Sequence, residues 1–259
     1  MHMIRVIWDT LRLQMKNSFI RPMFRFCLII NPIANTVLLY EMFRNSGHEN
    51  FGTFVILGAG LIALWGCICF SSAGDINRER WSGTLSMIYT APAGFQTIIF
   101  GKILGNTLLS LLTLLISALT AFILYGATFD MASPLLTIFA LLCTVICFIV
   151  FSTLIAYLLT LSRKTTLYMN LIEIPIVLVC GFVIPVSILP VWIHPISYIL
   201  PPTWAVRLLH LSIEGVVNSE FLNTFGVLVF ITVLYGITTM LLFKLIDKHI
   251  RKKATLDLT

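Results

Sequence analysis

A succession of long apolar runs is the feature that most constrains what this chain can fold into. About 20 helical residues, rising 1.5 Å each, cross the roughly 30 Å of hydrocarbon in a bilayer. Runs of this length occupy residues 22–43, 51–74, 98–125, 134–161, 167–190 and 222–246. Because 58% of the 259 residues are hydrophobic and only 11% are charged, the chain lacks the polar surface of a soluble domain. We expect an all-α, polytopic membrane protein whose six transmembrane helices form one domain, residues 1–259.

Lys and Arg residues gather on one side of these predicted spans. With the N-terminus placed in the cytoplasm, only Arg44 and Arg207 of the 17 Lys and Arg residues fall on the outer side. Positive charges favour cytoplasmic loops, so this bias predicts cytoplasmic N- and C-termini and an even number of spans in the cell membrane. The formal net charge of +6 then reports membrane topology, and we expect no nucleic acid partner.

Residues 1–20 are expected to form an amphipathic helix that lies in the membrane interface. Charged side chains repeat there at helical spacing, opposite a row of apolar side chains. The two rows are Arg5, Asp9, Arg12 and Lys16, and Ile4, Trp8, Leu11, Met15 and Phe19.

The connection between the second and third predicted spans, residues 76–92, is polar and has a helical pattern of its own. Trp81, Leu85 and Ile88 recur at i, i+4 and i+7 and so form one apolar stripe. Pro92 disfavours helical geometry at the residue before it and ends the helix. Such a surface helix can be a dock for a partner outside the membrane, or it can merely join two spans.

Gly83 and Asp75, in and beside this connection, can each be explained by local structure. Gly83 lowers helix stability by about 1 kcal/mol relative to Ala, and close approach of another backbone is one reason for a glycine there. Asp75 lies at the inner end of the second predicted span, where we expect it at the water interface.

The connection resembles the E-x-x-x-G-T-L…P…G-K pattern of ABC-2 type permeases, the membrane subunits of ATP-driven exporters. The matching positions are Glu79, Gly83, Thr84, Leu85, Ile88 and Pro92, followed by Gly101-Lys102. The chain length, the six spans, the N-terminal helix and a re-entrant segment before the last span also agree with this family. The resemblance implies that residues 76–92 are a coupling helix that docks in a groove of a cytoplasmic ATPase. The residues implied in this contact are Arg78, Glu79, Arg80, Trp81, Gly83, Thr84, Leu85, Ile88 and Pro92.

The resemblance also implies a function. The chain would be a permease of a bacterial cell membrane that dimerises with itself or with a homologous permease. It would export an amphipathic or lipid-like substrate, such as a drug, antibiotic or antimicrobial peptide, by alternating access at the dimer interface; export of a lipid-linked polysaccharide is the alternative. ATP and Mg would bind a separate ATPase subunit. Trp81 and Ser86 stand where the family often has acidic residues, which leaves the choice of ATPase open.

Residues 191–220 are too apolar for a solvated loop and contain too many prolines for another span. We expect one or two short helices that dip into the outer leaflet, where protein or water satisfies the backbone. Pro201, Pro202, Thr203 and Trp204 resemble the proline-aromatic turn of the same family, which implies an outer gate. An interfacial belt of Trp and Tyr side chains fits the segment equally well.

Glu173 and Pro175 make the fifth predicted span unusual. An ionisable residue within a span is costly and marks a candidate site on a transport pathway. A hydrogen bond between helices, or an ion pair with Arg163 or Lys164, would also explain Glu173. A secondary transporter driven by ions, the other function class considered, would need more such groups at this depth.

No catalytic or metal centre is expected in this chain. The six cysteines all lie in apolar runs without a His or carboxylate beside them, so they are expected to be packing residues. No Ser, His and carboxylate arrangement suggests an enzyme. Gly94 and Gly101-Lys102 have the wrong spacing for a phosphate-binding loop, and no Ser or Thr follows the Lys.

Overall fold

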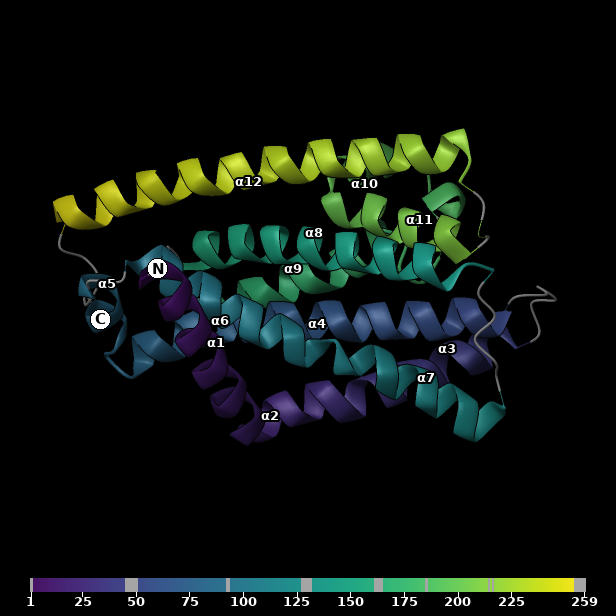
Figure 1. Ribbon diagram of the computed structural model, residues 1–259, viewed down its shortest axis with the longest axis horizontal. Helices are drawn as coiled ribbons and strands as arrows, with labels where there is room; N and C mark the ends of the chain where they lie inside the picture. Colours follow the sequence, from purple (N-terminus) through teal and green to yellow (C-terminus); the bar gives the residue numbers. More distant parts are fainter. Residues whose placement is uncertain are drawn as a thin grey trace.

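The computed structural model describes residues 2–44, 51–91, 94–126, 132–160, 165–184, 186–213, 215 and 217–253. Within these ranges the regular structure is entirely helical, as expected for an all-α membrane protein. Figure 1 shows the longest helices running along one common axis. The elements are α1 (His2–Ile20), α2 (Pro22–Arg25), the π-helical turn η1 (Phe26–Ile30), α3 (Asn31–Phe43), α4 (Phe51–Trp81), α5 (Leu85–Thr90), α6 (Phe95–Ser110), α7 (Leu112–Tyr125), α8 (Pro134–Thr160), α9 (Thr165–Val179), the 3-10 turn η2 (Val186–Ile188), α10 (His194–Ile199), α11 (Pro201–Ile213) and α12 (Ser219–Lys253).

Five segments of the described chain are long and apolar enough to cross a membrane. They agree with five of the six predicted spans. The third of them consists of α6 and α7, which meet at Leu111. The segments are Pro22–Phe43, Gly52–Cys69, Phe95–Tyr125, Pro134–Leu159 and Ser219–Leu245.

The fifth predicted span, residues 167–190, is not one continuous helix. Helix α9 ends at Val179, and its 15 residues reach about 22 Å. Pro175 lies inside this helix and removes one of its backbone hydrogen bonds. Gly181 follows with φ +81°, a left-handed conformation that glycine adopts without strain. The chain therefore leaves the helix early and continues through irregular backbone to η2.

Helix α4 occupies the centre of the bundle, and α12 lies at its edge. In the most apolar stretch of α4, 83% of the residues are buried, whereas in that of α12 only 11% are buried. Trp65 of α4 is fully buried and stacks on Phe151, with its edge toward Phe148 of α8. Since α4 also packs on α3, α6, α7 and α9, it contacts elements on both sides of the bundle.

The N-terminal helix forms as predicted, but one face of it packs on protein. Figure 1 shows α1 running steeply across the common axis of the long helices. A Cβ atom on Gly105 of α6 would lie 2.8 Å from the Leu11 backbone oxygen, and one on Gly101 would lie 3.0 Å from the Thr10 Cβ. The two glycines, four residues apart on one face of α6, let the backbones of α1 and α6 approach closely.

The two ends of the bundle differ. The start of α1, helix α5 and the last turns of α12 lie at one end, which we call the α5 end (Figure 1). Helices α10 and α11 lie in the other half, which we call the α11 half. There α11 packs between α8 and α12. Residues 191–220 thus contain two short helices, α10 and α11, where one or two were expected.

Candidate functional site

The polar connection at the α5 end differs from the single surface helix predicted over residues 76–92. Helix α4 continues without a break to Trp81, and only then does the chain turn into α5. Gly83 causes the break, because its φ of +68° is a left-handed conformation. No atom of the described residues lies within 4 Å of a Cβ added at Gly83, so conformation rather than close approach explains this glycine.

The break separates the predicted contact residues. Arg78, Glu79, Arg80 and Trp81 end α4, Thr84 precedes α5, and Leu85 and Ile88 belong to α5. The predicted stripe of Trp81, Leu85 and Ile88 is therefore wrong, and Trp81 is 85% exposed. Pro92 lies outside the described residues, as do the side chains of Arg80 and Leu85.

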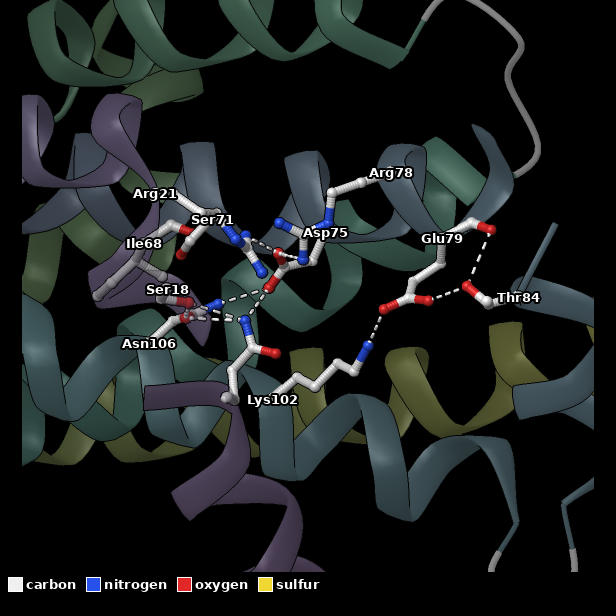
Figure 2. A network of polar contacts seen from close by, with 11 residues as sticks. Ser18, Arg21, Ile68, Ser71, Asp75, Arg78, Glu79, Thr84, Lys102 and Asn106 are labelled. Carbon is white, nitrogen blue, oxygen red and sulfur yellow. Dashed lines mark hydrogen bonds and ion pairs between the residues drawn. The ribbon is translucent and has the colours of Figure 1, made fainter. Parts of the chain in front are cut away.

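Asp75 is buried rather than at the water interface. Only 2% of it is exposed. Its carboxylate accepts hydrogen bonds from Gln14 of α1, Asn106 of α6 (2.8 Å), Arg78 (3.2 Å) and Arg21 (Figure 2). Two cationic and two amide donors thus compensate the loss of water around one carboxylate. We call Gln14, Arg21, Asp75, Arg78 and Asn106 the Asp75 cluster; it joins α1, α4 and α6.

Glu79 lies one helical turn further along α4 and holds the start of α5. Its carboxylate accepts hydrogen bonds from Lys102 of α6 and from the Thr84 hydroxyl (Figure 2). The Thr84 backbone N–H also donates to the Glu79 backbone oxygen at 3.0 Å. Partial burial raises the pKa of Glu79, but these hydrogen bonds and the charges of Lys102 and Arg78 outweigh it, so the pKa is lowered. Glu79 therefore stays ionised below the usual range of a glutamate.

Two large apolar side chains project from this end of the molecule. Trp81 at the end of α4 is 85% exposed, and Met87 on α5 is 72% exposed. Exposed Trp and Met are typical of surfaces that bind another protein. The Asp75 cluster and the contacts of Glu79 connect this surface to α1, α4 and α6.

The predicted outer residues form a compact turn in the α11 half. Pro201, Pro202 and Thr203 are buried at the start of α11. Thr203 donates to the Ser197 backbone oxygen (2.6 Å), and the Trp204 indole donates to that of Tyr198 (2.9 Å). These bonds fasten α11 to α10 across the extended Leu200.

A cavity of about 500 Å³ lies beside this turn. Its lining comes from the start of α4, the irregular backbone after α9, and α10 and α11. Since α10, α11 and the backbone after α9 meet here, a change in the turn at Pro201 would alter this space. The lining includes Thr53, Phe54, Gly181, Tyr198, Arg207 and His210.

Glu173 lies on α9 and packs against α4, eight residues before Gly181 in the lining of the cavity. Its Oε1 atom is 2.7 Å from the position that a Cβ on Gly66 would take. Pro175 is exposed on the same helix. Arg163 and Lys164, the predicted ion-pair partners of Glu173, lie outside the described residues.

Sequence reasoning missed the partners that organise these sites. Gln14 and Asn106, which bond to Asp75, are polar residues within or beside apolar segments, and that polarity is the signal that could have found them. Among the described residues, no group of three or more His, Cys, Asp or Glu side chains is placed to hold a metal ion.

Comparison with known proteins gives one match. The sequence model of a family described as ABC-2 type transporter matches residues 5–213, which is most of the chain. No curated protein and no solved structure matches.

Proposed function

Because the chain belongs to the ABC-2 type transporter family, it is a membrane component of an ABC transporter, and we propose that it is the permease subunit of an ATP-driven exporter. The observation that carries the proposal is the surface at the α5 end. There Trp81 and Met87 are exposed while the residues behind them are tied into the bundle. A cytoplasmic ATPase subunit that binds ATP and Mg would dock on this surface.

The proposed coupling runs through α4. Closure of an ATPase dimer would push on α5 and on the turn at Gly83. The bonds of Glu79 with Thr84 and Lys102 would pass the displacement to α4 and α6. The Asp75 cluster would pass it to α1. In this proposal the predicted contact residues act as two groups, one that touches the ATPase and one that holds the contact in place.

The remaining parts of the proposal concern the membrane. Two copies of the chain, or one copy and a homologous permease, would enclose a pathway between α4 and α9 of each subunit. The turn at residues 201–204 would form the outer gate, since it borders the cavity in the α11 half. Both termini would lie in the cytoplasm of a bacterial cell, because α1, α5 and the end of α12 share one end of the bundle (Figure 1).

A matched pair of tryptophan variants tests the docking surface. Trp81 is 85% exposed at the α5 end, and Trp192 is 73% exposed before α10. The test is co-purification with candidate ATPase subunits, together with the ATPase activity of each complex. We expect Trp81→Ala to weaken assembly about tenfold or more, as loss of a central Trp does at other interfaces, and to leave the thermal midpoint of the permease unchanged. Trp192→Ala is expected to assemble normally. Equal assembly of both variants with the ATPase would contradict docking at the α5 end.

A further inference from the structure

A carboxyl group and a carboxamide come together beside Gly66 of α4, and a second carboxamide is bonded to the first. Glu173 lies eight residues, about 12 Å, into α9. Asn35 of α3 donates a 2.9 Å hydrogen bond to Asn31. Glu173 Oε1 and Asn31 Nδ2 both lie beside Gly66 of α4, 2.7 Å and 3.7 Å from the position of a Cβ on this glycine. We call Asn31, Asn35, Gly66 and Glu173 the mid-span site.

Among the described residues, no positively charged side chain pairs with the mid-span site. Within the part of the chain that the structure describes, the Glu173 carboxyl takes part in no hydrogen bond or ion pair. An ionised carboxylate at this depth is costly unless a cation accompanies it. The carboxamides of Asn31 and Asn35 offer hydrogen bonds but no charge. A proton on Glu173, or a cation beside it, would therefore compensate the negative charge of this carboxylate.

The surroundings of Glu173 favour a cation that carries an apolar body. Leu171, Ile174 and Leu178 on the same helix are 64%, 63% and 55% exposed. Glu173 points toward α4 rather than along this apolar face, but it is only half-buried, so a ligand lodged at the edge between α9 and α4 can reach it. Gly66 adds room, since α4 presents no side chain at the point where the carboxyl lies.

We propose that the mid-span site binds the cationic headgroup of an amphipathic substrate. The Glu173 carboxylate serves as its counter-ion, Asn31 and Asn35 accept or donate hydrogen bonds, and the aliphatic face of α9 holds the apolar body. As a statement about a transported substrate this rests on the proposed permease function. Binding itself needs no ATPase, which keeps the two hypotheses separately testable.

The test uses the full chain in lipid nanodiscs without an ATPase. The probe is rhodamine 6G, a lipophilic cation, and its binding is followed by fluorescence anisotropy. Fluorescein methyl ester, which shares the three-ring skeleton but carries no positive charge, is the comparison. We expect Glu173→Gln to weaken rhodamine 6G binding about tenfold, as expected for loss of a charged partner, and to leave fluorescein ester binding unchanged. Glu41→Gln, at an exposed glutamate near the end of α3, is expected to bind both dyes like the wild type.

A second variant excludes a general loss of structure. Gly66→Ala places its methyl group 2.7 Å from Glu173 Oε1, the end of a flexible side chain that can move aside. We expect weaker rhodamine 6G binding at an unchanged thermal midpoint. Unchanged cation binding in both Glu173→Gln and Gly66→Ala would overturn the proposal and leave Glu173 a proton or packing site. An equal loss for both dyes would overturn it too. Neither result would bear on docking through Trp81.

Discussion

The carboxylate of Asp75 shows how a single side chain links three elements. Its donors Gln14 and Asn106 stand 61 and 31 residues away in the sequence. Asn106 is shared, because its side-chain oxygen also accepts a 2.6 Å hydrogen bond from Ser18 of α1. Because Asp75 is almost fully buried, each of these donors would have no water to bond with if the carboxylate were absent. The network therefore holds only while the charge at its centre is present.

Removing that charge is expected to destabilise the fold. Asp75→Asn removes the negative charge that faces Arg21 and Arg78. It also points the new NH2 group at two of the donors that bonded to the carboxylate. We expect a loss of about 2–3 kcal/mol in the free energy of unfolding, measured as a lower thermal midpoint in detergent. The control is Glu41→Gln, since Glu41 and Arg44 form an exposed pair at 3.9 Å. This control is expected to cost less than about 1 kcal/mol. Equal losses in the two variants would show that the Asp75 cluster contributes nothing special.

Glu79 makes stability at the α5 end depend on pH in a defined direction. Its pKa is lower in the folded protein than in the unfolded chain, mainly because its bonds with Lys102 and Thr84 outweigh its burial. The stabilisation is thus complete above the unfolded value, about 4.3, and is lost as the pH falls through the lower folded value. We expect the difference in thermal midpoint between wild type and Glu79→Gln to stay constant from pH 7 to about 5. It should then shrink toward pH 3, and a difference independent of pH over this whole range would refute the assignment.

At the scale of elements, the contact between α1 and α6 depends on missing side chains. Gly101 and Gly105 give α1 a surface on which its backbone can lie directly. The pair occupies the same stretch of α6 as Lys102 and Asn106, which bond to α4 and α1. Helix α6 therefore contacts α1 through its backbone, and it bonds to α1 and α4 through its side chains.

A methyl group at Gly105 is expected to separate α1 from α6. In Gly105→Ala the new carbon would lie 2.8 Å from the Leu11 backbone oxygen, which no side-chain rotation can relieve. We expect a loss of about 1–3 kcal/mol, seen as a lower thermal midpoint. Gly226→Ala on α12 is the matched control, because nothing described lies within 4 Å of its new carbon. A Gly105→Ala protein as stable as the Gly226→Ala protein would contradict the close approach of the backbones.

The ends of elements were harder to predict than their existence. Apolar length predicted the five long crossings because lipid requires it. Polarity, however, reports where a helix leaves the lipid and not where the helix ends, so α4 was expected to stop before Asp75. The conformation of Gly83 ends it instead. The burial of Asp75 could not be predicted either, because its donors come from α1 and α6, and only tertiary packing brings these together.

At the scale of the whole molecule, polar groups on an open face of α9 call for a covering partner. Asn170 is exposed and Glu173 half-buried on a helix otherwise lined by aliphatic side chains. Polar residues at membrane depth normally face protein or water rather than lipid. A second copy of the chain packed against the exposed side of α9 would cover them.

Cysteine cross-linking in native membranes tests this arrangement. Ile174 on α9 and Phe230 on α12 are 63% and 70% exposed, so a cysteine at either position is accessible. We expect Ile174→Cys to give a disulfide-linked dimer upon mild oxidation, and Phe230→Cys to remain monomeric on gels. The wild type supplies the background, since its described cysteines are buried or partly buried. Dimers formed through Phe230→Cys alone would place the interface on α12.

The unbroken length of α4 has a mechanical consequence. Its 31 residues measure about 46 Å, more than the thickness of the hydrocarbon layer. Near its other end, Gly58 lies so close to the Phe182 carbonyl that a Cβ there would approach that oxygen to 2.9 Å. If an ATPase pushed on the chain at Trp81, a continuous helix of this length would transmit the displacement to the backbone beside the cavity in the α11 half. Opening of that cavity would then be synchronous with ATP hydrolysis, and the size of the opening would depend on the stiffness of α4.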